Sequence, residues 1–350
     1  MGVSDQMNQK WKKVEYSRRE INEAGDSFRN GEVVSTRSRE IVENWRAAHA
    51  YPMHVIYIHL RGMAKNKNGF LVVERLKRLE SIIDKIKREK DMQLWRMQDL
   101  GGCRFIVQTV NEVYQYADKY KKSRIRHELK REYDYIKQPK KSGYRSLHLV
   151  YKFHSDKKEE YNKNMLIEIQ FRTYLQHLWS TAVETMGVFT KQNLKSGKGS
   201  PQVREFFALV SSLFAMEEGT SLVPGTPENR EELILSIKKI DDEYHLIRQL
   251  DAIQAASMYD ETHGKGKGYY ILVLNYNEGS VRIKHFMPSD FEEANKAYGK
   301  LEEINKENTM DIVLVRAESF GALKSAYSNY FTDIQTFISR VKGFLKEQSN

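Results

Sequence analysis

Residues 163–173, with the sequence KNMLIEIQFRT, alternate between apolar and polar side chains with a period of two. The polar positions are Glu168, Gln170 and Arg172. Because successive side chains of a strand point to opposite faces, this segment predicts a strand with one packed face and one polar face. Charged groups in such a strand must line a cleft or be paired. An edge strand of a two-faced antiparallel sheet would show the same alternation.

The segments around this strand predict an α+β unit built on a small sheet. Helical periodicity and charge pairs predict helices over residues 5–50, 51–63, 70–97, 111–123 and 174–189. Apolar or alternating runs predict strands at 101–110, 133–138 and 144–153.

The last third of the chain predicts a second domain. Helices are expected over 202–218 and 228–257, followed by the sequence DETHGKGKG at 260–268, which has the composition of a linker. Beyond it, a hairpin, a helix, a strand and a final helix follow, an order typical of a small ββαβα domain. We therefore expect domains at 1–259 and 269–350.

Charge and cysteine content narrow the class of protein. The net charge is +10, and residues 119–145 hold eleven Lys or Arg against three acidic residues. This excess favours a polyanionic partner, although many proteins are simply basic. The N-terminus has no apolar signal core, no segment could span a bilayer, and Cys103 is the single cysteine. We expect a cytoplasmic protein with no membrane partner.

A row of cations in the predicted helix 75–85 suits a polyphosphate. The cations are Arg75, Lys77, Arg78 and Lys85, and Ser81 adds a hydroxyl beside them. Arginine binds phosphate oxygens two at a time, and lysine adds point charge. A solvated charged face would look the same.

Two carboxylates could complete a phosphoryl-transfer site. Asp99 precedes the apolar strand that contains Arg104, and Glu168 lies in the alternating strand. Mg²⁺ binds one or two carboxylates together with substrate phosphates. Metal, carboxylate, cations and a positioned nucleophile are the components of phosphoryl transfer.

Four motifs in order, RLKRLESIIDK, DLGGCR, PKKSGYRSLH and EIQFRT, resemble the synthetase domain of the RelA/SpoT family over residues 40–190. Members of this family transfer pyrophosphate from ATP to a ribose 3′-hydroxyl. The resemblance implies a nucleotidyltransferase-like mixed sheet flanked by helices.

The resemblance also implies roles for individual residues. Arg75 and Arg104 would sandwich the adenine of ATP, and Lys77, Ser81 and Lys85 would hold its phosphates. Asp99 would bind Mg²⁺, and Glu168 would bind Mg²⁺ or act as base. Tyr144 would stack on the acceptor base. The residues implied near that base are Lys140, His148, Gln170 and Arg172.

The layout departs from the long bifunctional members of the family, because only about forty residues precede the synthetase-like region. It is similar to the CapRel-type subgroup, in which a toxin domain carries its own C-terminal antitoxin domain. That similarity implies modification of the tRNA 3′ CCA end, with RNA rather than DNA as partner, and release by a phage capsid protein. Tyr327 and Tyr330 would then cover the ATP site; ordinary core aromatics are the alternative interpretation.

Two other functions stay open from the sequence. A small alarmone synthetase would make (p)ppGpp from GDP or GTP. A non-catalytic RNA- or ribosome-binding protein would keep the fold alone, but it would have no need of Asp99, Tyr144 and Glu168 together.

Overall fold

The structure, a computed structural model, describes residues 11–30, 35–77, 79–189, 200–251, 268–275, 280–287, 289–304, 310–317 and 330–346. It divides into two compact units. The first comprises Met1–Ile136 and Arg145–Tyr174, and the second comprises Lys137–Tyr144 and Leu175–Asn350. The predicted linker at 260–268 lies outside the described residues except for its last one, so the predicted boundary there stays a prediction.

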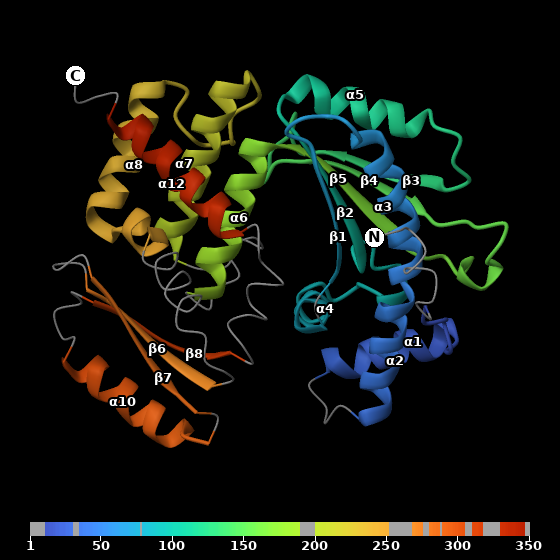
Figure 1. Cartoon of the computed structure of the whole chain (residues 1–350), viewed down its shortest axis with the longest axis horizontal. Helices are drawn as coiled ribbons and strands as arrows, with labels where there is room; N and C mark the ends of the chain where they lie inside the picture. Colours follow the sequence, from blue (N-terminus) through green and yellow to red (C-terminus); the bar gives the residue numbers. More distant parts are fainter. Residues whose placement is uncertain are drawn as a thin grey trace. The chain divides into compact units, whose positions relative to one another are not determined.

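The first unit is built on a mixed five-stranded sheet with the strand order β1-β2-β5-β4-β3 (Figure 1). The strands are β1 (Leu71–Leu76), β2 (Gly101–Val107), β3 (Glu128–Asp134), β4 (Leu147–Lys152) and β5 (Leu166–Thr173). β2 and β5 run parallel, and every other neighbouring pair is antiparallel. The predicted mixed α+β fold is confirmed.

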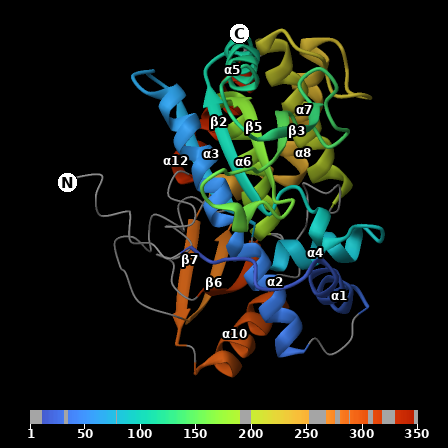
Figure 2. The ribbon, with the colours of Figure 1, turned by 90° about the vertical axis from the view of Figure 1, so that its right-hand side faces the viewer.

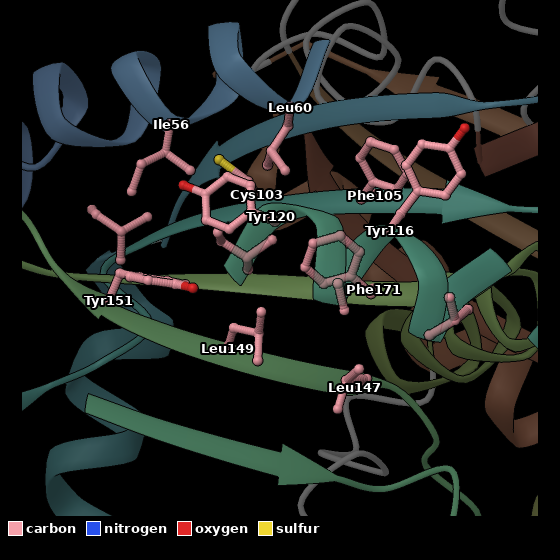
Figure 3. Packing of buried hydrophobic residues seen from close by; sticks show 14 of the residues in the cluster. Ile56, Leu60, Cys103, Phe105, Tyr116, Tyr120, Leu147, Leu149, Tyr151 and Phe171 are labelled. Atoms are coloured by element: carbon pink, nitrogen blue, oxygen red, sulfur yellow. The ribbon is translucent and has the colours of Figure 1, made fainter. Parts of the chain in front are cut away.

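One face of this sheet is packed. The helices α3 (Ala50–Ala64) and α5 (Val110–Lys121) contribute to one core cluster with β2, β4 and β5 (Figures 2 and 3). From the strands, this cluster takes Cys103, Phe105, Val107, Leu147, Leu149, Tyr151, Ile167, Ile169 and Phe171. Ile167, Ile169 and Phe171 are the apolar positions of the alternation predicted for residues 163–173, so the opposite face of β5 carries the polar positions.

The N-terminal helices pack on a second cluster. α1 (Arg18–Arg29) and α2 (Thr36–Ala48) join α4 (Leu79–Arg88) around apolar side chains that include Trp45 and Ile86. Ser17 caps α1 with a complete capping box to Glu20, an arrangement that satisfies two orphan backbone donors. The predicted helical region 5–50 is therefore two helices.

The predicted helix over 70–97 is wrong in its first part. Residues 71–76 form β1, which pairs along its whole length with β2; α4 begins at Leu79, and a short 3₁₀ turn covers Leu94–Arg96. The run LVVERL holds two β-branched valines, which suit a strand. The predicted short strand at 133–138 also lies earlier, because β3 ends at Asp134.

The second unit contains helices α6 (Tyr174–Phe189), α7 (Pro201–Glu218), α8 (Arg230–Tyr244) and α12 (Tyr330–Lys346). Phe337 of α12 packs against Phe207 and Phe214 of α7. His177 of α6 and Asp333 of α12 form a buried pair, with Nε2 and Oδ2 separated by 3.0 Å. The C-terminal helix is thus part of a helical core with α6 and α7 (Figure 1).

The same unit contains a three-stranded antiparallel sheet, order β7-β6-β8. Its strands are β6 (Gly268–Asn275), β7 (Ser280–Phe286) and β8 (Met310–Ala317), and α10 (Phe291–Ile304) packs on it through Ala294. The predicted ββαβα order is confirmed for the described residues. Among these residues, no helix is both long and apolar enough to cross a membrane.

Candidate active site

The polar face of the first sheet brings predicted site residues into two rows across the strands. Residues paired between neighbouring strands share a face. One row runs Arg75, Gly102, Glu168, Val150 and Arg131. The next row runs Val73, Arg104, Gln170, His148 and Tyr133. The predicted donor-binding arginines therefore lie on β1 and β2, the catalytic candidate Glu168 on β5, and His148 on β4.

Gly102 leaves room at the centre of this face. A Cβ at this position would meet only backbone oxygens within 4 Å, those of Glu168 at 3.7 Å and Arg75 at 3.9 Å. No described side chain therefore fills the space next to Gly102. Glycine allows a ligand to approach the backbone here, between the guanidinium-bearing β1 and the carboxylate of β5.

Asp99 lies two residues before β2 and forms ion pairs with two lysines. Lys77 Nζ is 2.8 Å from Oδ2, and Lys85 Nζ is 3.0 Å from Oδ1. Burial by itself raises the pKa of Asp99, but the two ammonium groups more than offset it and hold this pKa far below its usual range. The group is therefore a permanent carboxylate with two cations beside it, as a polyphosphate and metal site requires.

Glu168 is held at both oxygens. His148 Nδ1 lies 2.9 Å from Oε1, and Gln170 Nε2 donates to Oε2 at 2.6 Å. Burial raises the pKa of Glu168 and the charge of Asp99 acts in the same direction, yet the contact with His148 keeps this pKa below its usual value. Glu168 is thus an oriented carboxylate whose electrostatic environment includes Asp99.

Gln170 and Arg172 extend this arrangement along β5. Arg172 Nη2 donates to Gln170 Oε1 at 3.4 Å, a long contact, and the side chain of Arg172 is buried. Both were predicted near the acceptor base. Their hydrogen bonds form a chain that ends on Glu168, so their clearest structural role is to orient that carboxylate.

The predicted phosphate-binding row is not one helix face. Arg75 lies in β1 and Lys77 follows it, while Ser81 and Lys85 lie on α4. Arg78 lies outside the described residues. The strand-to-helix turn, rather than helical spacing, brings Lys77 and Lys85 together on Asp99.

The loop 137–144 belongs to the second unit. Gly143 has a φ of 91°, and a Cβ there would come within 2.8 Å of Trp179 and 2.9 Å of Ser211, so only glycine fits this turn. Lys140 Nζ lies 5.3 Å from the centre of the half-buried Tyr144 ring. The Gly143 N–H donates to the carbonyl of Lys140 at 2.8 Å and closes this turn, and the roles of Lys140 and Tyr144 at the acceptor stay predictions.

The predicted blocking pair cannot be compared with the structure. Tyr327 lies outside the described residues, and only the backbone of Tyr330, the first residue of α12, is described.

Arg46 is a site residue that the sequence reasoning missed. Its Nε donates to the carbonyl of Lys77 at 2.6 Å, while the Lys77 N–H donates to Leu100 at 2.8 Å. Both backbone groups of Lys77 are thereby fixed. No local signal marks Arg46, because the contact joins α2 to a turn 31 residues away.

One part of the chain, which contains the site described above, matches a known protein family model. Residues 74–193 match the family model described as "Region found in RelA / SpoT proteins". These residues include the second half of β1, the other four strands of the first sheet, and Asp99 and Glu168. The chain thus contains a region similar to one found in RelA and SpoT proteins, where the sequence motifs predicted it.

Curated relatives match a similar portion. GTP pyrophosphokinase YjbM of Bacillus subtilis is 34% identical over 114 residues, covering 31% of this chain and 52% of the relative. GTP pyrophosphokinase YwaC of the same organism is 32% identical over 115 residues, with the same coverage. The chain spans about half the length of the curated relatives it matches.

Solved structures also align. A GTP pyrophosphokinase family protein from Streptococcus pneumoniae has 24% sequence identity and a TM-score of 0.43, covering 53% of this chain and 91% of that one. Small alarmone synthetase 1 from Bacillus subtilis, solved with its product pppGpp, has 22% identity and a TM-score of 0.43, covering 51% and 92%.

Proposed function

We propose that the protein is an ATP-dependent pyrophosphokinase that transfers the β,γ-diphosphoryl group of ATP to a ribose 3′-hydroxyl. The observation that carries this proposal is the placement of a lysine-bound Asp99 and an oriented Glu168 in one electrostatic environment, within the RelA/SpoT-type region. The name of YjbM as a GTP pyrophosphokinase supports the same class of reaction.

In the proposed step, the acceptor oxygen bonds to the β-phosphorus of ATP, the bond to the α–β bridging oxygen breaks, and AMP leaves. The hydroxyl proton passes to the Glu168 carboxylate and then to solvent. Phosphoryl transfer depends mostly on positioning and charge stabilisation, so the chief task of Glu168 is to orient the hydroxyl. Lys77 and Lys85 face the negative charge of the phosphates.

Asp99 and Glu168 are the residues that would hold Mg²⁺. Both are kept as carboxylates, and carboxylate oxygens retain lone pairs beyond those in their present hydrogen bonds. A hard cation that binds one or two carboxylates and the substrate phosphates fits this donor set. The ion would neutralise charge on the triphosphate.

We propose that the acceptor is the 3′ CCA end of tRNA. Modification of this end would block translation. The basic segment 119–145 supports this choice, because phosphate contacts supply much of the affinity for a polynucleotide. GDP or GTP is the second candidate, favoured by the names of both curated relatives.

Incubation with γ-labelled ATP and either deacylated tRNA or GDP distinguishes these acceptors. Label on tRNA supports the first, and label on GDP alone refutes it. Glu168→Gln should lower transfer by about 10²-fold or more without loss of fold, because the two side chains have nearly the same shape. A Glu168→Gln variant with full activity would overturn the catalytic assignment.

We also propose that the C-terminal region inhibits the enzyme and that a phage capsid protein relieves this inhibition in antiviral defence. The support is the order of elements in residues 268–346, which follows the predicted fused layout. Changing Tyr327 and Tyr330 to Ala should raise toxicity on expression in cells. Unchanged toxicity at equal protein level contradicts the blocking role.

A further inference from the structure

We propose that Tyr133 is a stacking platform for a second base of a single-stranded RNA 3′ end, beside the nucleotide that reacts. The inference rests on the proposed function and narrows its acceptor to a polynucleotide. It comes from the position of β3, the edge strand beyond β4 on the acceptor side of the sheet.

The pairing register places Tyr133 next to the catalytic group. Tyr133 pairs with His148, and His148 pairs with Gln170 of β5. These residues share the polar face with Glu168, which His148 contacts directly. Since neighbouring strands lie about 4.8 Å apart, the backbone of Tyr133 is about 10 Å from that of β5. This offset lies beyond a hydroxyl that reacts at Glu168 and on the side away from Arg75 and Arg104.

The ring of Tyr133 has both ring and hydrogen-bond contacts. It stacks on Tyr135 with a centroid separation of 5.8 Å and an interplanar angle of 4°. Tyr135 in turn meets the His148 ring edge-on at 5.2 Å. The Tyr133 hydroxyl lies 3.4 Å from Oε1 of Gln98, the neighbour of Asp99 in the sequence. A ring with such contacts loses little conformational entropy when a base stacks on it.

The Tyr133 ring is only partly covered. The ring is half-buried, and in the part of the chain that the structure describes Tyr135 is the one aromatic ring against it. Stacking of a base on an aromatic side chain tolerates any base, because every base has a π-face.

The charged residues next to Tyr133 on β3 differ between the two faces of the strand. Glu132 and Asp134 lie on the face opposite Tyr133, where Lys121 and Tyr114 engage them. The exposed Arg131 shares the face of Tyr133, and its Nη1 lies 3.4 Å from the tyrosine hydroxyl. A cation beside a stacking ring is the combination that single-stranded nucleic acids bind. A free mononucleotide would have no second base to place here.

The test is binding of a fluorescent RNA hairpin that ends in single-stranded CCA, compared with a blunt hairpin of the same stem. Tyr133→Ala should raise the Kd for the tailed RNA about tenfold, as expected for one lost base stack, and leave the Kd for blunt RNA unchanged. Tyr133→Trp should bind tailed RNA at least as well as the native protein. Tyr244→Ala, at the end of α8, is a matched control and should change neither Kd.

Tyr133→Leu, which keeps apolar bulk without the ring, serves as a second variant if Tyr133→Ala fails to fold. The inference is overturned if a folded variant binds tailed RNA like the native protein, or loses affinity for tailed and blunt RNA equally. The labelled-ATP assay separates this result from the proposed function. If RNA binds through Tyr133 but no acceptor receives label, the inference about Tyr133 holds and the proposed pyrophosphokinase activity is refuted.

Discussion

At the scale of single residues, the two lysines around Asp99 set how the fold responds to acid. The pKa of Asp99 lies below its ordinary value, so the ionised carboxylate stabilises the folded state above that ordinary value and loses this effect only as pH falls through the folded pKa. Lys85→Met removes one of the two opposing charges, and the pKa of Asp99 should rise by about 1 to 3 pH units. The acid-induced loss of melting temperature that Asp99 contributes should then be smaller, and should end at a higher pH, than in the native protein.

Lys87→Met on the same helix is the control, because Lys87 is exposed and the lysines that pair with Asp99 among the described residues are Lys77 and Lys85. Its acid transition should coincide with that of the native protein. Coincident transitions for Lys85→Met as well would show that the second ammonium does not tune this carboxylate.

His148 offers a similar prediction for catalysis. Burial raises the pKa of Glu168, and His148 is the chief group that lowers it again. His148→Ala should therefore raise that pKa, and because the carboxylate is the proposed active form, the acid limb of the rate profile should move to higher pH. His154→Ala, which removes a half-exposed histidine paired with Asp156, should leave the profile in place. A fall in rate at every pH with an unmoved acid limb would assign His148 to the acceptor alone.

At the scale of elements, two adjacent glycines at the start of β2 report on the two faces of the sheet. A Cβ on Gly101 would come within 2.8 Å of Ile167 and 3.3 Å of Met53 in the packed core, so Gly101→Val should destabilise the protein by about 1–3 kcal/mol. A Cβ on Gly102 would make only ordinary van der Waals contacts, so Gly102→Ala should change stability by no more than about 0.5 kcal/mol. Urea unfolding of both variants measures the difference, and equal losses would mean that the two faces are packed alike.

The same elements show how far sequence reasoning reaches. The alternation in residues 163–173 predicted both faces of β5, because a period of two is a local property of the chain. The helix predicted from residue 70 failed at β1, because the pairing of LVVERL with β2 is a tertiary contact that its own periodicity does not reveal. The contact of Arg46 could not be predicted from the sequence for the same reason, whereas Asp99 and Glu168 were predicted from their position in or beside apolar strands.

At the scale of the whole molecule, the C-terminal helix has a structural role that any test of regulation must respect. Phe337 of α12 is fully buried against Phe207 and Phe214, and Asp333 pairs with His177 in the interior of the second unit. A chain cut before α12 would expose these aromatic side chains and remove the carboxylate of Asp333 from His177. Loss of activity in such a truncation would then reflect a damaged helical core rather than any regulatory contact.

Phe337→Ala separates the two effects. It should cost about 3–5 kcal/mol, the usual loss for a buried phenylalanine, and hydrogen exchange should rise in peptides from α6 and α7 while peptides from β2 and β5 keep their protection. Lys346→Ala, at an exposed position of the same helix, should change neither. If α6 and α7 exchange no faster in Phe337→Ala, α12 is dispensable for the helical core and simple truncation becomes a fair test of inhibition. If they do exchange faster, inhibition must be tested by substitutions that leave α12 in place, such as those at Tyr327 and Tyr330.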